Sequence, residues 1–201
     1  MAPPYRIETE RLVVRCWEPR DAAALKEAVD SSLDHIRPWM PWAANEPQTI
    51  EEKVELIRGF RGLFDTDQDY VYGIFSRDES EVWGGTGLHK RHGEDAFEIG
   101  YWVRQSRAGQ GLATEASAAL TRVAFEVSGV DRVEIRVDPP NERSRKVPLK
   151  LGYVEEATLR RRLEPGPRDV VIYSIFADGY KGSPPGAAEV EAYDVRGERI
   201  L

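Results

Sequence analysis

The stretch 96–116, AFEIGYWVRQSRAGQGLATEA, decides the fold. Its first part, 96–103, places Phe, Ile and Tyr on one side of an extended chain, which predicts a strand. From 112 to 127 apolar residues recur at helical spacing until Gly129, which predicts a helix and its end. A strictly alternating segment, 132–137, predicts a second strand. A strand, a helix and a strand in this order require a crossover, so we expect a mixed α/β fold.

The link between this strand and this helix carries two glycines. Gly109 and Gly111 permit a tight turn with bare backbone amides, and a helix N-terminus with free N–H groups suits a pyrophosphate. Arg104 and Arg107 add positive charge. The spacing fits neither a P-loop, which ends in Gly-Lys-Ser/Thr, nor a dinucleotide fingerprint, which needs a third glycine. An ordinary strand-to-helix connection also fits these residues, so both interpretations stay open.

The residues before position 96 extend this unit. Apolar periodicity predicts strands at 11–17, 69–76 and 82–90 and helices at 21–29 and 49–63. The last two of these strands and 96–103 are separated by short turn segments, which favours an antiparallel meander. Thr49 and Glu52 have the spacing of a capping box. The segment 33–45, LDHIRPWMPWAAN, holds two prolines, so we expect a loop or short helical turns there.

The residues after position 137 complete the predicted fold. Their pattern predicts a helix at 141–151 and strands at 153–161 and 170–176. Pro148 lies inside that helix, where a proline costs on the order of 3 kcal/mol. We therefore expect the helix to bend or to begin late, near Ser144.

Length and composition suit one domain. The chain has 201 residues, of which 41% are apolar, enough for one sizeable core. We assign 1–180 to this domain and 181–201 to a C-terminal tail or small hairpin. The tail is expected either to be flexible or to add strands to a partner subunit, which leaves a homodimer open.

Charge and cysteine content exclude several classes of protein. A net charge of -7 argues against nucleic acid as the main partner, although local basic clusters suit either a small polyanionic ligand or a solvated face. Cys16 is the only cysteine, so neither an internal disulfide nor a zinc site is expected, and we interpret it as a small core residue. We find neither an apolar run long enough for a membrane helix nor a secretion signal. The sequence therefore predicts a cytoplasmic protein without a membrane partner.

Five motifs in order give a specific resemblance: RPWMPW (37–42), EIGYWV (98–103), SRAGQGLATEA (106–116), NERS (141–144) and LGY (151–153). Together they resemble the GNAT acyltransferases, and particularly the RimJ/RimL-like branch of ribosomal-protein N-terminal acetyltransferases. The resemblance covers about residues 5–178. It implies an α/β (α+β) GNAT fold with a mixed, mostly antiparallel sheet of about seven strands. It also implies that 96–103 and 132–137, which match the family's fourth and fifth strands, splay apart between flanking helices.

The resemblance implies acetyl-CoA as co-substrate and no metal. Backbone groups of Trp102 and Val103 are expected to pair with the pantetheine arm, and Asn141 to lie beside it. The family's phosphate turn begins with Gln or Arg where this chain has Ser106, so Arg107 is expected to supply the charged donor. The turn itself would comprise Arg107, Ala108, Gly109, Gln110, Gly111, Leu112, Ala113 and Thr114.

Amide formation from a thioester needs a base for the attacking amine and a donor for the departing thiolate. Many family members use a Tyr as acid just before the Gly-Tyr pair, but Pro148 occupies that position, so the acid role is expected to move to Ser144. Glu98 is the first candidate for the base because it lies on the splayed strand and faces away from Phe97. It could equally be an ordinary ion-paired glutamate. Glu164, His89 and water remain alternatives.

The segment with two tryptophans is expected to form the acceptor site. Trp39 and Trp42 would be costly to leave in water, and with His89 they would line an amine site. At least one of the two tryptophans is also expected to pack in the core. The predicted function is acetylation of a protein or peptide N-terminus. Small-molecule amines such as antibiotics, polyamines or amino acids, a non-catalytic acyl-CoA-binding module and a structural interaction protein remain alternatives.

Overall fold

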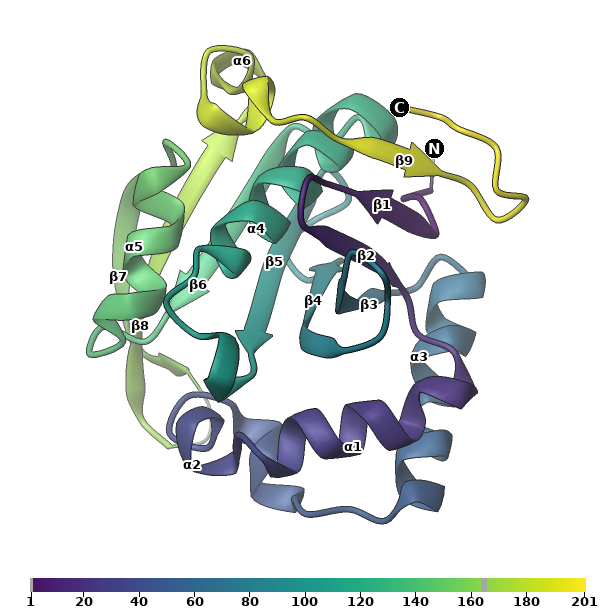
Figure 1. The fold of residues 1–201 in the computed structure, drawn as a ribbon. Helices are drawn as coiled ribbons and strands as arrows, with labels where there is room; N and C mark the ends of the chain where they lie inside the picture. Colours follow the sequence, from purple (N-terminus) through teal and green to yellow (C-terminus); the bar gives the residue numbers. More distant parts are fainter. Residues whose placement is uncertain (1, 164–165) are drawn as a thin grey trace.

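A mixed sheet organises the computed structural model, which describes residues 2–163 and 166–201 (Figure 1). Within these residues the sheet has nine strands in the order β7-β8-β6-β5-β4-β3-β2-β1-β9. The strands are β1 (Arg6–Glu8), β2 (Leu12–Cys16), β3 (Tyr70–Ser76), β4 (Val82–His89), β5 (Ala96–Val103), β6 (Arg132–Val137), β7 (Val154–Leu163), β8 (Arg168–Phe176) and β9 (Glu191–Tyr193).

The predicted meander and crossover are confirmed. Strands β2 to β5 pair antiparallel, each with the next. The chain then crosses through α4 (Leu112–Val123) to β6, which pairs parallel with β5. Strands β6 and β7 both pair antiparallel with β8. The candidate active site lies where the parallel strands β5 and β6 separate.

The helices follow the apolar periodicity closely. The capping box is present, since the Thr49 hydroxyl accepts from the Glu52 amide at 3.2 Å and the Glu52 carboxylate accepts from the Thr49 amide at 2.7 Å. After α4 one π-helical turn ends at Gly129, whose φ of 70° suits a glycine. Besides α4, the helical elements are η1 (Pro19–Asp21), α1 (Ala22–Asp30), α2 (Leu33–Ile36), η2 (Pro41–Asn45), α3 (Ile50–Asp65), η3 (Gln105–Arg107), η4 (Ala124–Ser128), α5 (Glu142–Lys150), α6 (Ala177–Tyr180) and η5 (Pro184–Ala187).

Strand β2 shows how the sheet divides two cores. Leu12, Val14 and Cys16 pack with α4 in one apolar cluster. Val13 and Trp17 pack with residues of α1 and α3 in the other. This alternation follows from the twofold period of a strand, and it places α4 on the opposite face of the sheet from α1 and α3 (Figure 1).

The two ends of the chain meet at one edge of the sheet. Strand β9 pairs antiparallel with β1, from Arg6 opposite Tyr193 to Glu8 opposite Glu191, and a turn then returns the chain so that Arg199 bridges to Tyr193. These two strands raise the sheet from the predicted seven to nine. Residues 191–201 form the small hairpin that was one expectation for the tail, and its first strand joins this chain's own sheet rather than a partner's. No helix in the described ranges is long and apolar enough to span a membrane.

Candidate active site

Strands β5 and β6 separate after three residue pairs. Their parallel pairing runs from Ala96 opposite Arg132 to Glu98 opposite Glu134, whereas β5 stays paired with β4 as far as Val103. Between residues 99 and 103, the edge of β5 that faces β6 therefore has no strand partner in the described part of the chain. An extended ligand can pair with such an edge. Trp102 and Val103 lie there, as expected from the sequence.

The glycine turn follows directly on this edge. Gly109 and Gly111 have φ values of 78° and 81°, a region that favours glycine, and Gly111 is the N-cap of α4 without a side-chain cap. None of the described residues accepts a hydrogen bond from the amides of residues 109–114 outside the helix. These amides lie at the positive end of the helix dipole, so they form a site for an anion.

A cavity of about 750 Å³ joins the turn to the open edge of β5. All the predicted cofactor-binding residues line it except Gln110. Basic side chains of α5 line it too: Arg143, Lys146 and Lys150. His35 also lines the cavity, and burial and then the charge of Arg143 lower its pKa. The cavity therefore combines a backbone anion site with a basic wall.

Two arginines near the turn form ion pairs with glutamates of this chain. Arg107 lines the cavity, but its guanidinium binds Glu81 at 2.7 Å and lies over the Trp83 ring at 4.8 Å. Arg104 binds Glu27 of α1 at 2.7 Å and does not line this cavity. The expectation that Arg104 adds charge at the turn is therefore wrong, because that side chain holds α1 to the sheet.

Ser144 and Tyr101 meet where the strands have opened. The hydroxyls of Tyr101 and Ser144 are 3.0 Å apart, and the Tyr101 hydroxyl also lies 3.1 Å from the Ser144 carbonyl oxygen. Asn141 caps α5 by accepting from the Ser144 amide at 3.1 Å. Burial raises the pKa of Tyr101, so its phenol stays protonated.

Pro148 leaves the carbonyl oxygen of Ser144 without its helical hydrogen bond. The helix begins at Glu142 and continues through Pro148, so the predicted late start at Ser144 is wrong. Pro148 has no N–H for the carbonyl of Ser144, four residues earlier. The Tyr101 hydroxyl supplies that hydrogen bond instead. No pattern in the sequence points to Tyr101, because its role depends on the packing of β5 against α5.

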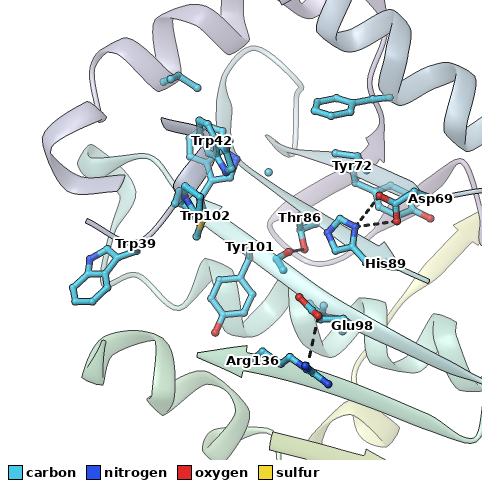
Figure 2. Close-up of a pocket in the computed structure, with 18 of the residues that line it drawn as sticks. Trp39, Trp42, Asp69, Tyr72, Thr86, His89, Glu98, Tyr101, Trp102 and Arg136 are labelled. Atoms are coloured by element: carbon cyan, nitrogen blue, oxygen red, sulfur yellow. Dashed lines mark hydrogen bonds and ion pairs between the residues drawn. The ribbon is translucent and has the colours of Figure 1, made fainter. Parts of the chain in front are cut away.

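A second cavity, of about 700 Å³, lies on the α1 and α3 side of β5 (Figure 2). Trp39, Trp42 and His89 line it, as expected from the sequence. Trp42 is 38% exposed and packs edge-on against Trp102 at 5.8 Å. Trp39 is half-buried, so neither tryptophan of the predicted pair belongs to the core, and that part of the expectation is wrong. Tyr101, Asn141 and Ser144 line both cavities, which therefore meet at the splay.

Glu98 lines the second cavity, facing away from Phe97 as predicted, but it is heavily paired. Its carboxylate lies 2.6 Å from His92, 3.2 Å from Arg91 and 3.9 Å from Arg136. Glu98 is therefore an ion-paired glutamate, which was the second interpretation of this residue. Figure 2 shows its contact with Arg136.

The His89 ring contacts the carboxylate of Asp69, a partner that the sequence did not predict. Its Nδ1 lies 2.9 and 3.0 Å from the two carboxylate oxygens of Asp69 (Figure 2). Both residues line the second cavity. The antiparallel register of β3 and β4 pairs Tyr70 with Leu88. It therefore brings Asp69, which precedes Tyr70, beside His89, which follows Leu88. Glu164, the other candidate base, lies outside the described residues.

The described part of the chain contains no group of three or more His, Cys, Asp or Glu side chains that could hold a metal ion. Its two cavities meet at a splayed strand pair, with an anion site at one end and a histidine and carboxylates at the other. These features define a site that can hold an extended anionic ligand beside a second cavity with groups able to take up a proton.

Comparisons with known proteins agree. Residues 11–154 match the family model of the acetyltransferase (GNAT) domain, so the chain belongs to the GNAT acetyltransferase family and is an N-acetyltransferase. It is 28% identical over 159 residues to the [ribosomal protein uS5]-alanine N-acetyltransferase of Escherichia coli (strain K12), covering 77% of this chain and 80% of that one. The structure of Mycobacterium smegmatis RimJ in complex with CoA-disulfide superposes with a TM-score of 0.81 and 28% identity, covering 92% of this chain and 95% of that one. The chain is thus RimJ/RimL-like.

Proposed function

We propose that the chain transfers the acetyl group of acetyl-CoA to the α-amine of a protein or peptide N-terminus. The observation that carries this proposal is the continuity of the two cavities at Tyr101, Asn141 and Ser144. A thioester bound along the splay can be reached there by an amine from the second cavity. The similarity to the uS5-alanine acetyltransferase supports a peptide N-terminus as acceptor, and with it a cytoplasmic location.

The described residues fit acetyl-CoA. The amides of residues 109–114 and the lysines of α5 suit its phosphates. The open edge between residues 99 and 103 suits the amide groups of its pantetheine arm. In this arrangement Trp39 and Trp42 form the wall that receives the side chain beside the acceptor amine.

The transfer proceeds by direct attack. Cys16 does not line either cavity, and burial raises the pKa of its thiol to about 12, so it is not a nucleophile. The amine nitrogen attacks the thioester carbonyl, one proton leaves the nitrogen, and the C–S bond then breaks. Ser144 is proposed to donate its hydroxyl hydrogen to the departing sulfur. Glu98 and His89 are the described candidates for the base.

Release of CoA thiol tests the acceptor class. We expect release with short peptides that begin with Ser, Ala or Met, because an α-amine is largely available near pH 8. The same peptides with a blocked N-terminus are the control and should give no release above background. Release only with small amines would show that the acceptor is a small molecule. Binding of CoA without release with any acceptor would favour a non-catalytic module.

Tyr101→Phe tests how Ser144 is held. The variant removes a hydroxyl that contacts both Oγ and the carbonyl of Ser144, so we expect kcat to fall about tenfold while the KM for acetyl-CoA stays unchanged. Tyr153→Phe is the matched control, since its buried hydroxyl binds Thr121 away from both cavities. Equal kcat values for the two variants would argue against a role for Tyr101.

A further inference from the structure

We propose that His89, oriented by Asp69, is the general base that takes the proton from the attacking amine. The inference rests on the proposed acetyl transfer and assigns its base. Asp69 immediately precedes β3, and His89 is the last residue of β4. Both side chains line the acceptor cavity (Figure 2).

The contact with Asp69 fixes which ring nitrogen is basic. A carboxylate offers only acceptors, so Nδ1 carries the hydrogen in the 2.9 Å contact. Nε2 then keeps its lone pair. None of the described residues forms a hydrogen bond with Nε2, whereas Nδ1 contacts both oxygens of Asp69.

Two glycines make room for the His89 ring where it lies against β4 and β5. A Cβ atom at Gly87 would lie 2.6 Å from Nε2, and a Cβ at Gly100 would lie 3.4 Å from it. Gly100 belongs to the part of β5 that has left β6. The next residue, Tyr101, contacts Ser144. The basic nitrogen therefore lies beside the unpaired part of β5 in the acceptor cavity, which Ser144 also lines.

Glu98 is a poorer candidate because of its partners. Its side chain is 14% exposed and contacts Arg91, His92 and Arg136. A proton on this carboxylate would weaken its ion pairs with Arg91 and Arg136. Glu98 also lies opposite His89 in the register of β4 and β5, so its negative charge stabilises the imidazolium that forms when His89 accepts a proton.

The proton balance is simple. The lone pair of the amine forms the N–C bond, and the carbonyl π electrons move to oxygen. His89 Nε2 takes one proton from the nitrogen, and the electrons on oxygen then restore the carbonyl as the C–S bond breaks. The sulfur takes a proton from Ser144, which regains one from solvent, and His89 releases its proton to solvent. The products are an amide and CoA thiol.

The test compares kcat for His89→Gln with kcat for the wild type, using the peptide acceptor of highest turnover between pH 6 and about 9.5. We expect kcat to fall about 10²- to 10⁴-fold near pH 7 with an unchanged KM for acetyl-CoA. The deficit should shrink at high pH, where hydroxide can take the proton from the nitrogen in place of His89. Asp69→Asn, which only positions His89, should show the same pH trend with a loss of about tenfold.

Other charged groups are controlled in the same experiment. The other charged groups that line the cavity with His89 are Glu46, Lys53, Asp69, Arg91, Glu98, Arg136 and Asp138. His92→Gln is the matched histidine variant, because His92 contacts Glu98 and does not line either cavity; its kcat should fall far less. If Glu98→Gln gives the pH-dependent loss and His89→Gln keeps most of its kcat, the proposal is overturned.

A second measurement separates this inference from the proposed function. If no peptide is acetylated by the wild type, the proposed acceptor is wrong, but ¹⁵N NMR of the imidazole still reports the dyad. We expect His89 to carry its hydrogen on Nδ1 in the wild type and to lose that preference in Asp69→Asn. A wild-type tautomer with the hydrogen on Nε2 would overturn the assignment of His89 as base.

Discussion

Lys53→Met is expected to lower the free energy of unfolding by about 3–5 kcal/mol. The Lys53 ammonium and the Glu46 carboxylate form an ion pair whose side chains are 1% and 2% exposed. The second carboxylate oxygen of Glu46 accepts from the Gln48 amide at 3.0 Å. Loss of Lys53 leaves a buried carboxylate without its counter-charge. The pair also joins α3 to the end of the tryptophan segment, so the variant should lose part of the acceptor wall.

Urea unfolding measures this effect, and the double variant Glu46→Gln/Lys53→Met is its control. A neutral amide in place of the carboxylate needs no counter-charge, so the double variant should recover much of the lost stability. If the single variant loses less than about 1 kcal/mol, the pair is not a buried ion pair in solution.

Gly111→Val is expected to weaken CoA binding by about 100-fold or more. The φ of 81° at Gly111 is a genuine outlier for a β-branched residue, so the turn must change its path. The amides that follow it in α4 would then no longer converge on one anion. Each hydrogen bond to a charged phosphate contributes about 1.5–3 kcal/mol, and 1.4 kcal/mol corresponds to tenfold in affinity.

Gly197→Val is a matched control for Gly111→Val. Gly197 has a φ of 78°, lies in the turn after β9 and has nothing within 4 Å of an added Cβ. Both variants should lose stability through backbone strain, but only Gly111→Val should lose the rise in melting temperature on adding CoA. At 100 times the dissociation constant this rise corresponds to about 2.7 kcal/mol for the wild type. Equal responses in both variants would exclude the glycine turn as the phosphate site.

The central part of the fold could be predicted because its patterns are long and local. Strands 96–103 and 132–137 were predicted with the bounds that the structure shows. Strand β1 was not predicted, because three residues are too few to show a period, and β9 was expected only as part of a small hairpin. Their pairing joins the two ends of the chain, and no local signal reports such a contact.

Only those parts of the site that lie in contiguous sequence motifs could be predicted. The glycine turn and Ser144 lie in contiguous motifs, and the structure brings both to the splay. The partners of Asp69, Tyr101 and Arg104 depend on strand register and helix packing, which the sequence does not display. Their contacts span 20, 43 and 77 residues along the chain.

Backbone amide shifts on adding CoA test the central claim most directly. In a ¹H–¹⁵N spectrum of the full chain, saturating CoA should move the amide signals of residues 99–103 and 109–114. Signals of β1 and β9, at the far edge of the sheet, should stay in place. That result would place CoA along the open edge of β5 and at the start of α4. An unchanged spectrum, or shifts confined to other parts of the chain, would contradict the account.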